Sequence, residues 1–512
     1  MRPRLKFSRR DFLKLTSLLP LTWALQPLVK LKNRSASPDK PNIILLVFDA
    51  WSALHVPLFG YVRNTMPNLE RFAANATVYH NHYSAGTFTV PGTASLLTGM
   101  HPWTHRAFQL SAGGITHSQV NHQLFAALSN TRTTLGYAQN RFADLLLCQA
   151  ENYIDQHIES GSFNVEHSYV YNLPIFKKDE RIAYSSFEDN IFQTGDGADS
   201  SLFLGSFYRL WVLYNRLKET KEYGKDYPTG LPDATELFRL GDLVDGAIKV
   251  LSGLKEPAFT YLHFYPPHGL YEPDARFAGS FNDSWKPVDK PIHPLAYDQN
   301  TPDFSNSTRL LYDQYIANWD AEVSRLFDYL RTSGLLDRSY VIVTSDHGEL
   351  FERGEVGHWT RLMYESIMHV PLLISAPGQK GRKDVQAFTS SVDLLPTLAQ
   401  MAGNPIPSWA EGQLLPEFGG NEDASRSLFT VDAKNNPSFA PLSKTSISLT
   451  KNPFRLTYYN YPEIGGEKFE FYNFAEDPDE LNDLYLSNPS SASDMRSELL
   501  QKLSEVNIPF DS

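Results

Sequence analysis

The chain has 512 residues, 42% hydrophobic and 20% charged, which is enough for one large globular domain and a smaller one. Residues 1–37 contain nine of the 46 basic and one of the 58 acidic residues, so the rest of the chain carries a formal charge of −20. Broad electrostatic binding to nucleic acid or to an anionic membrane is therefore disfavoured. We expect no nucleic-acid partner, and we expect an anionic substrate to be held by a local positive centre such as a metal ion.

The first 37 residues resemble a targeting segment. Arg9 and Arg10, in "SRRDFLK", precede the apolar run "LTSLLPLTWALQPL", which is too short to span a bilayer comfortably. This order is typical of a twin-arginine export signal. We predict export to the periplasm or the cell surface, with the segment either removed or retained as a membrane anchor before a polar linker.

Three apolar runs predict central strands of a parallel sheet: "NIILLVFDA" from residue 42, "PAFTYLHFYPPH" near 258 and "SYVIVTSDHGE" near 340. Uniform hydrophobicity indicates strands that are covered on both faces. Helical stretches such as "YDQYIANWDAEVSRLFDYLRTSG" lie between them. This alternation predicts a doubly wound, mostly parallel α/β sheet over residues 38–405.

The other segments predict a cover and a second domain. Residues 201–220 have aromatic residues at helical spacing, which favours a helical cover over a lid or a membrane-contacting surface. Residues 406–512 predict a small antiparallel sheet with a terminal helix, an α+β subdomain. Cys148 is the only cysteine and lies in the apolar run "ADLLLCQA", so we predict a buried, inert thiol and no disulfide.

Polar residues follow the predicted strands at their carboxyl ends, where open α/β sheets bind ligands. They are Asp49, His263, His268, Asp346 and His347. Asp346 and His347 can reach one metal ion if the backbone turns at the following glycine, and Asp49 supplies a third ligand from another strand. Two carboxylates and one imidazole suit Zn²⁺, Mn²⁺ or a harder cation.

The stretch "TFTVPGTASLLTG", residues 87–99, begins like a strand and ends like a helix, with Thr89 at the turn. Thr89 is either the cap of that helix or a nucleophile at an anion site, because a helix N-terminus attracts phosphate and sulfate oxygens. A threonine hydroxyl is a weak nucleophile, but coordination to a divalent cation lowers its pKa.

Ordered motifs over residues 41–405 resemble the sulfatase branch of the alkaline phosphatase superfamily: "PNIILLVFDA", "TVPGTASLLTGMHPWTHRA", "FTYLHFYPPHGLYEP", "YVIVTSDHGELFERGEVGH", "HVPLLISAPG" and "SSVDLLPTLAQMAG". The segment "FEFYNFAEDPDELNDLY" is similar to the C-terminal subdomain of that family. Sulfatases oxidise a Cys or Ser to formylglycine, whereas this chain has Thr89 at that position. It also has Thr93 in place of an arginine and Ala50 in place of a metal-binding aspartate.

These departures resemble the threonine-using relatives, among them phosphonate monoester hydrolases and the phosphoglycerol or phosphoethanolamine transferases of bacterial envelopes. The resemblance implies no formylglycine and one divalent metal ion, Mn²⁺ or Zn²⁺ in preference to Ca²⁺ or Mg²⁺, held by Asp49, Thr89, Asp346 and His347. It implies that Thr89, His268 and His358 are catalytic. It further implies substrate-binding residues: Gln139, Asn140, Arg106 and His263.

We therefore predict an exported, metal-dependent hydrolase that cleaves phosphodiesters or phosphonate monoesters, ranked above sulfate esters, through Thr89. A transferase of the same fold, acting on an envelope lipid or glycan, is one alternative. A non-catalytic binding protein, suggested by Ala50 and Thr93, is another. The sequence leaves the oligomeric state open.

Overall fold

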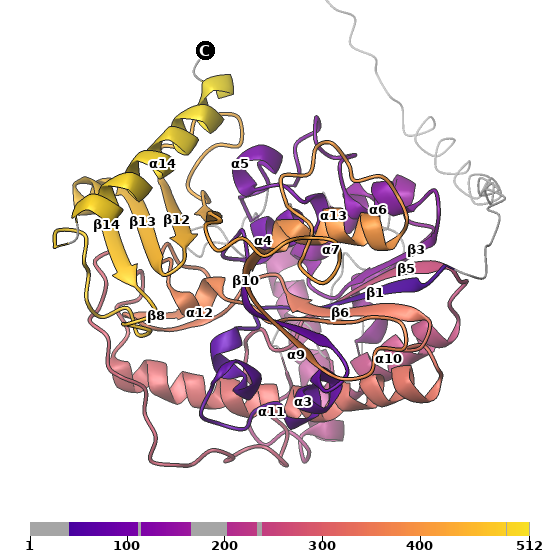
Figure 1. Cartoon of the computed structure of the whole chain (residues 1–512). Coiled ribbons are helices and arrows are strands. Elements are labelled where there is room, and N and C mark those ends of the chain that lie inside the picture. Colours follow the sequence, from indigo (N-terminus) through magenta and orange to yellow (C-terminus); the bar gives the residue numbers. More distant parts are fainter. Residues whose placement is uncertain (1–39, 111–113, 165–201, 233–237, 488, 511–512) are drawn as a thin grey trace, which may run out of the picture. The chain divides into compact units, whose positions relative to one another are not determined.

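The computed structural model describes residues 40–110, 114–164, 202–232, 238–487 and 489–510 (Figure 1). The predicted targeting segment, residues 1–37, lies outside them. The boundary between residues 405 and 406 stays a prediction, although the helices that pack on the main sheet end with α13, Leu394–Met401, and the second sheet begins at Leu428.

Eight strands form one mixed, mostly parallel sheet in the order β10-β2-β9-β6-β1-β5-β3-β4. Strand β9 pairs antiparallel with both of its neighbours, and the other pairings in this sheet are parallel. The strands are β1 Asn42–Phe48, β2 Thr77–Tyr83, β3 Thr133–Ala138, β4 Gln156–Ile158, β5 Ala258–Phe264, β6 Ser339–Ser345, β9 Leu372–Ser375 and β10 Lys383–Ser390.

Helices cover both faces of this sheet (Figure 1). Alternate residues of β1 show why: Ile44, Leu46 and Phe48 belong to an apolar core shared with α3, α10 and α11, whereas Ile43 and Val47 belong to another, shared with α4, α6, α7 and α13. The helices are α3 Pro67–Ala73, α4 Thr89–Thr98, α5 Pro102–His105, α6 Leu124–Leu128, α7 Arg141–Gln149, α9 Leu202–Tyr223, α10 Leu240–Ser252, α11 Pro302–Thr332, α12 Glu365–Met368, α13 Leu394–Met401 and α14 Pro489–Asn507.

A four-stranded antiparallel sheet and α14 form the C-terminal part, as predicted (Figure 1). Its strands are β11 Leu428–Asp432, β12 Thr445–Lys451, β13 Phe454–Tyr461 and β14 Gly466–Asn473; a separate hairpin is made of β7 Leu350–Glu352 and β8 Glu355–Gly357. The Val431 N–H donates to the Ala85 carbonyl at 2.9 Å, and Thr430 Oγ1 donates to the Ser84 carbonyl at 2.6 Å. The second sheet thus supports the segment that leads into α4.

The predicted α/β class with a small C-terminal α+β part is confirmed, with local differences. Strand β2 ends at Tyr83, so residues 84–88 form a turn where a strand was expected before Thr89. The predicted helix over residues 201–220 is present as α9, but Phe207, Leu210 and Tyr214 are exposed. No described helix has both the length and the hydropathy that a bilayer span requires.

Candidate active site

A buried cluster lies at the carboxyl ends of three adjacent strands. Asp49 follows β1, Asp346 and His347 follow β6, and His263 lies near the end of β5; all four are fully buried. Because β6, β1 and β5 are neighbours, residues from distant parts of the sequence meet at one edge of the sheet. Ligand atoms of Asp49, Asp346 and His347 lie within 4.8 Å of one another.

Helix α4 brings Thr89 to this cluster. Thr89 is the first residue of the helix and Phe88 is the N-cap residue, with no side-chain capping bond, so Thr89 is not the cap. The Thr89 Oγ1 atom lies 3.4 Å from His347 Nε2. A Cβ atom at Gly92 would lie 2.3 Å from the Asp346 carbonyl oxygen, so only glycine allows α4 to approach β6 this closely.

The first turn of α7 completes the contacts of Thr89. Asn140 is the N-cap residue of α7, and its Nδ2 donates to Asp49 Oδ2 at 2.6 Å and to Thr89 Oγ1 at 3.3 Å. Thr93 Oγ1 donates to Asp346 Oδ2 at 3.2 Å. Asn140, predicted to bind substrate, therefore also orients a metal-ligand candidate, and Thr93 stands where the resemblance placed an arginine.

The imidazole of His347 is oriented by the backbone. Its Nδ1 lies 2.9 Å from the Gly348 carbonyl, which accepts the hydrogen, and this leaves Nε2 facing the carboxylates. Nε2 is 3.3 Å from Asp49 Oδ1 and 3.6 Å from Asp346 Oδ2. His263 Nε2 faces the same pair, 3.5 Å from Asp49 and 3.7 Å from Asp346. His263 thus contacts the metal-ligand candidates.

The charges in this cluster shift its pKa values. Burial raises the pKa of Asp49, but the neighbouring His268, His263 and His347 outweigh it, and the pKa lies well below its usual range. Burial and the charge of Asp49 raise the pKa of Asp346. Burial lowers the pKa of His347, but the two carboxylates outweigh it and raise the value to about 9. A protonated His347 thus supplies positive charge beside the carboxylates of Asp49 and Asp346, which contact no Lys or Arg among the described residues.

The donor set fits a divalent cation. Asp49 Oδ1 and His263 Nε2 are buried and have no hydrogen-bond partner among the described residues. Tetrahedral Zn²⁺ with bonds of about 2.0–2.2 Å to oxygen and nitrogen separates its ligand atoms by roughly 3.3–3.6 Å. The distances from His347 Nε2 to Asp49 Oδ1, Asp346 Oδ2 and Thr89 Oγ1 are 3.3, 3.6 and 3.4 Å.

A cavity of about 480 Å³ opens beside the cluster and is lined by His268 and His358, the two predicted acid–base residues. The rings of His268 and His358 lie 4.6 Å apart, and the His358 ring lies 4.5 Å from that of His347. His358 Nδ1 is 3.0 Å from Glu349 Oε1. The lining residues include Glu272 and Glu349 and no Lys or Arg within the described part of the chain.

Two residues that were predicted to bind substrate, Arg106 and Gln139, have their side chains engaged elsewhere. Arg106 donates to the carbonyls of Ser438, at 2.9 Å, and Ala440, and it packs over the ring of Phe510, because the segment after α5 faces the C-terminal part. Gln139 accepts from the Tyr265 N–H at 3.0 Å and donates to Asn164 Oδ1 at 3.2 Å. The Gln139 backbone N–H donates to the His263 carbonyl at 2.9 Å, but the contacts of both side chains lie outside the cluster.

Glu349 is the site residue that sequence analysis missed. It is fully buried and pairs with His358. Burial raises its pKa, but the charge of His358 and their hydrogen bond outweigh this and lower it. The motif "SDHGE" contained the signal, because an acid two residues after the metal-ligand candidate His347 is placed near the same strand end.

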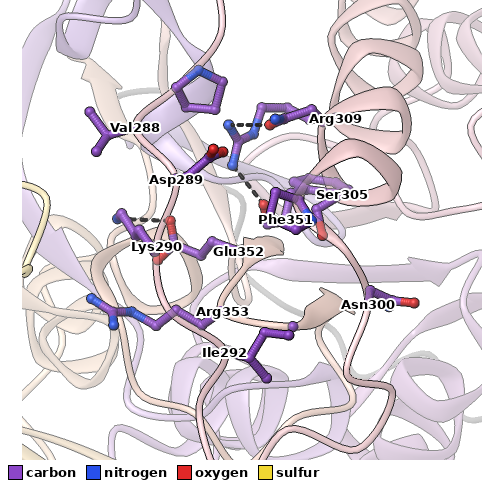
Figure 2. Close-up of a pocket in the computed structure, with 14 residues that line it drawn as sticks. Val288, Asp289, Lys290, Ile292, Asn300, Ser305, Arg309, Phe351, Glu352 and Arg353 are labelled. Carbon is purple, nitrogen blue, oxygen red and sulfur yellow. Dashed lines mark hydrogen bonds and ion pairs between the residues drawn. The ribbon is translucent and has the colours of Figure 1, made fainter.

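A further pocket lies between residues 287–292, the start of α11 and hairpin β7–β8 (Figure 2). Its cavity is about 20 Å³, roughly the space of one water molecule. Lys290 pairs with Glu352 at 2.8 Å, and Arg309 donates to the Phe351 carbonyl at 2.7 Å. The pocket is therefore too small and its cations too fully engaged for a substrate.

The mixed sheet, with its carboxylate–histidine cluster and threonine-bearing helix, defines an alkaline phosphatase-like α/β fold. Residues 41–145 and 211–404 match the model of the Sulfatase family, and residues 354–508 match the model described as N-sulphoglucosamine sulphohydrolase, C-terminal. The chain belongs to the sulfatase family, so the predicted family and the predicted class of ester hydrolase are confirmed.

Individual relatives agree. Arylsulfatase K of Bos taurus is 31% identical over 498 residues, which cover 93% of this chain and 83% of that protein. An ulvan-active sulfatase of Formosa agariphila is 24% identical over 498 residues, covering 94% and 85%. The crystal structure of the phosphonate monoester hydrolase of Agrobacterium radiobacter superposes with a TM-score of 0.65 at 18% identity, covering 92% of this chain and 96% of that one.

Proposed function

We propose that this protein is a metal-dependent ester hydrolase in which Thr89 is the nucleophile, and that it acts on a singly charged phosphodiester, phosphonate monoester or sulfate ester. The observation that carries the proposal is the convergence of Thr89 Oγ1, Asp49 Oδ1, Asp346 Oδ2 and His347 Nε2 in a buried place. Asp49, Asp346, His347 and Thr89 would hold one ion, Mn²⁺ or Zn²⁺ in preference to Ca²⁺ or Mg²⁺. When bound, it would lower the pKa of the Thr89 hydroxyl and neutralise charge on the ester.

The residues around Thr89 support an in-line displacement. The Thr89 hydroxyl releases its proton to solvent, and its Oγ1 then forms a bond to phosphorus or sulfur while the bond to the leaving oxygen breaks. The leaving oxygen takes a proton from His268 or His358, and the same residue then accepts a proton from the water that hydrolyses the threonine ester. His358 Nδ1 donates to Glu349, so its Nε2 is available for these transfers. Asn140 holds the Thr89 hydroxyl and Asp49 together.

The cavity favours an ester with one negative charge and an uncharged leaving group. Glu272 and Glu349 line it, and Leu270, Tyr271 and Leu311 supply apolar surface. A second charge on the substrate would meet Glu349 in a lining that contains no described Lys or Arg, although Glu272 is paired with Arg216 at 3.4 Å just outside it. Phosphodiesters, phosphonate monoesters and sulfate monoesters all meet this condition.

Phosphorus esters rank above sulfate esters in this proposal because a threonine cannot be oxidised to the aldehyde of formylglycine. A sulfuric ester is the second candidate, and the names of the curated relatives, arylsulfatase K and ulvan-active sulfatase, favour it. Both candidates use the same nucleophile, so activity on either requires Thr89.

Export by the twin-arginine route to the periplasm or cell surface is part of the proposal and rests on Arg9, Arg10 and the apolar run that follows them. A retained segment would act as a membrane anchor and bring the site to an envelope lipid or glycan. Replacing both arginines with lysines should leave the protein in the cytoplasm, as cell fractionation would show.

The decisive experiment compares wild type, Thr89→Ala and Thr89→Ser on p-nitrophenyl sulfate, bis(p-nitrophenyl) phosphate and p-nitrophenyl phenylphosphonate. We expect the phosphorus esters to be cleaved fastest and kcat to fall by at least about 10³-fold in Thr89→Ala, as for loss of other catalytic nucleophiles. Thr89→Ser, which keeps a hydroxyl, should retain measurable activity. Equal rates in wild type and Thr89→Ala, with normal circular dichroism, would refute the nucleophile. Much faster cleavage of the aryl sulfate would reverse the ranking.

A further inference from the structure

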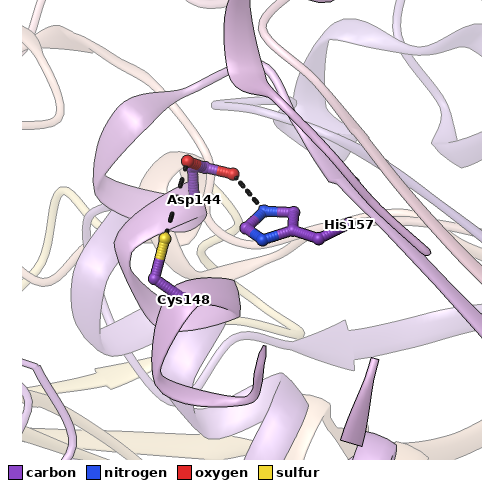
Figure 3. Close-up of side chains that lie close together, drawn as sticks. All are labelled: Asp144, Cys148 and His157. Atoms are coloured by element: carbon purple, nitrogen blue, oxygen red, sulfur yellow. Dashed lines mark hydrogen bonds and ion pairs between the residues drawn. The ribbon is translucent and has the colours of Figure 1, made fainter. Parts of the chain in front are cut away.

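A second group of metal-ligand side chains lies between α7 and the edge strand β4: Asp144, Cys148 and His157 (Figure 3). Asp144 and Cys148 are four residues apart on α7, so they share one face of the helix. His157 lies in β4, which pairs with β3 at the edge of the large sheet. The side chain of Asp144 lies between the other two.

The distances suit a small cation. His157 Nε2 is 2.8 Å from Asp144 Oδ1, Cys148 Sγ is 4.0 Å from Asp144 Oδ2, and one atom from each residue lies within 4.8 Å of the other two. Zn²⁺ bonds of about 2.3 Å to sulfur and 2.0–2.2 Å to nitrogen and oxygen place tetrahedral ligand atoms roughly 3.3–3.6 Å apart. The 2.8 Å pair is shorter and the 4.0 Å pair longer than these separations by about half an ångström, so metal binding would need these side chains to shift by that order.

The exposure of these side chains and the kinds of ligand atom that they offer also favour a metal site. Cys148 is partly exposed, which corrects the expectation of a buried thiol, and the side chain of His157 is 19% exposed. An ion can therefore enter from solvent and keep a water molecule as fourth ligand. Thiolate and imidazole ligands together favour Zn²⁺ over Mg²⁺, Ca²⁺ and Mn²⁺.

We propose that Asp144, Cys148 and His157 form a second metal site that binds Zn²⁺ and fixes α7 against β4. Binding replaces the thiol proton, which passes to solvent, with a sulfur–metal bond. The role of this site is structural. It would hold α7 in place, and the N-cap residue of α7 is Asn140, which contacts Thr89 and Asp49. This site does not depend on the proposed reaction at Thr89.

The test uses the metal-free full chain, because Cys148 is its only cysteine and a thiol reagent reports on this site alone. Added Zn²⁺ should slow the reaction of Cys148 with 5,5′-dithiobis(2-nitrobenzoate), and added Co²⁺ should give a thiolate-to-cobalt charge-transfer band. Asp144→Asn and His157→Asn should weaken Zn²⁺ protection by more than the roughly 10–100-fold that loss of a supporting partner costs. His117→Asn, at an exposed histidine, is the matched control.

Cys148→Ser should remove the band and keep the Thr89-dependent turnover, which separates this site from the catalytic cluster. The absence of a Co²⁺ band in the wild-type protein would overturn the proposal. Equal Zn²⁺ protection in wild type and His157→Asn would do so as well, because it would show binding by the thiol without a three-residue site.

Discussion

Two buried charge clusters in this protein are built in opposite ways. Near the C-terminal sheet, Arg455 donates to Glu480 at 2.6 Å and to Glu365, and all three side chains lie at most 16% exposed. At the candidate active site, Asp49 and Asp346 are fully buried and meet histidines, with no Lys or Arg contact among the described residues.

In our proposal, this difference separates a structural ion-pair cluster from a metal-binding site. One guanidinium holds both carboxylates: burial raises the pKa of Glu365, but the charge of Arg455 outweighs it and lowers the value, whereas burial keeps the pKa of Glu480 raised. Asp346 has a raised pKa because it is buried beside Asp49, so its charge is costly in the metal-free protein. Two buried carboxylates that meet only histidines, which can release their protons, form a place where a metal cation gains most.

The largest effect should come from Asp346→Asn. Loss of a ligand should abolish metal binding and reduce kcat by at least about 10³-fold. The metal-free variant should nevertheless melt at a higher temperature than metal-free wild type, because a raised carboxyl pKa means that ionised Asp346 destabilises the fold. Calorimetry and metal analysis of both proteins would check this.

Asp313→Asn is the matched control, since Asp313 is equally buried but pairs with Arg63 at 2.7 Å and with His55. It should lower the melting temperature and keep the metal. If the Asp346→Asn protein instead had a lower melting temperature and kept its metal, the proposed contrast between the two clusters would be wrong.

Arg455→Met should have the next largest effect, now on stability. It leaves Glu365 and Glu480 buried without their cation, which costs about 3–5 kcal/mol in comparable cases. Urea unfolding would measure the loss, while metal content and kcat per folded molecule should stay unchanged. A change in metal affinity would show that the clusters are not independent.

The next effect is a change of metal affinity with pH, which should follow the deprotonation of His347. His347 must lose its proton to bind a metal, and its pKa is raised to about 9 in the metal-free protein. Affinity should therefore rise by up to about tenfold per pH unit between pH 6 and 9, and level off above that. Competition titrations with a chelating dye in the Cys148→Ser protein would follow it; a flat profile below pH 9 would contradict the shift.

Arg106→Leu should have the smallest catalytic effect. The variant loses hydrogen bonds to two C-terminal carbonyls, so it should cost about 1–3 kcal/mol of stability. The KM should not change, because the structure does not place Arg106 at the cluster. A KM raised tenfold would restore the role in anion binding that the sequence suggested.

The sequence predicted the sheet and the convergence of Asp49, Asp346 and His347, because apolar runs that end in acids identify strand ends and Gly348 permits the turn. The resemblance to the threonine-using relatives of the sulfatases added Thr89. The sequence could not assign His263 to the carboxylates, since that depends on β5 lying beside β1. The contacts of Arg106 and Gln139 were also out of reach, because they depend on the C-terminal part and on Asn164. Such long-range pairings leave no local pattern.

The most direct test of the central claim is the metal content of the purified Cys148→Ser protein, measured by elemental mass spectrometry beside the double variant Cys148→Ser, Asp346→Asn. The Cys148→Ser background removes the proposed second site. The account predicts about one Mn or Zn ion per chain, absent from the double variant. No ion in the first protein, or the same ion content in both, would contradict the account.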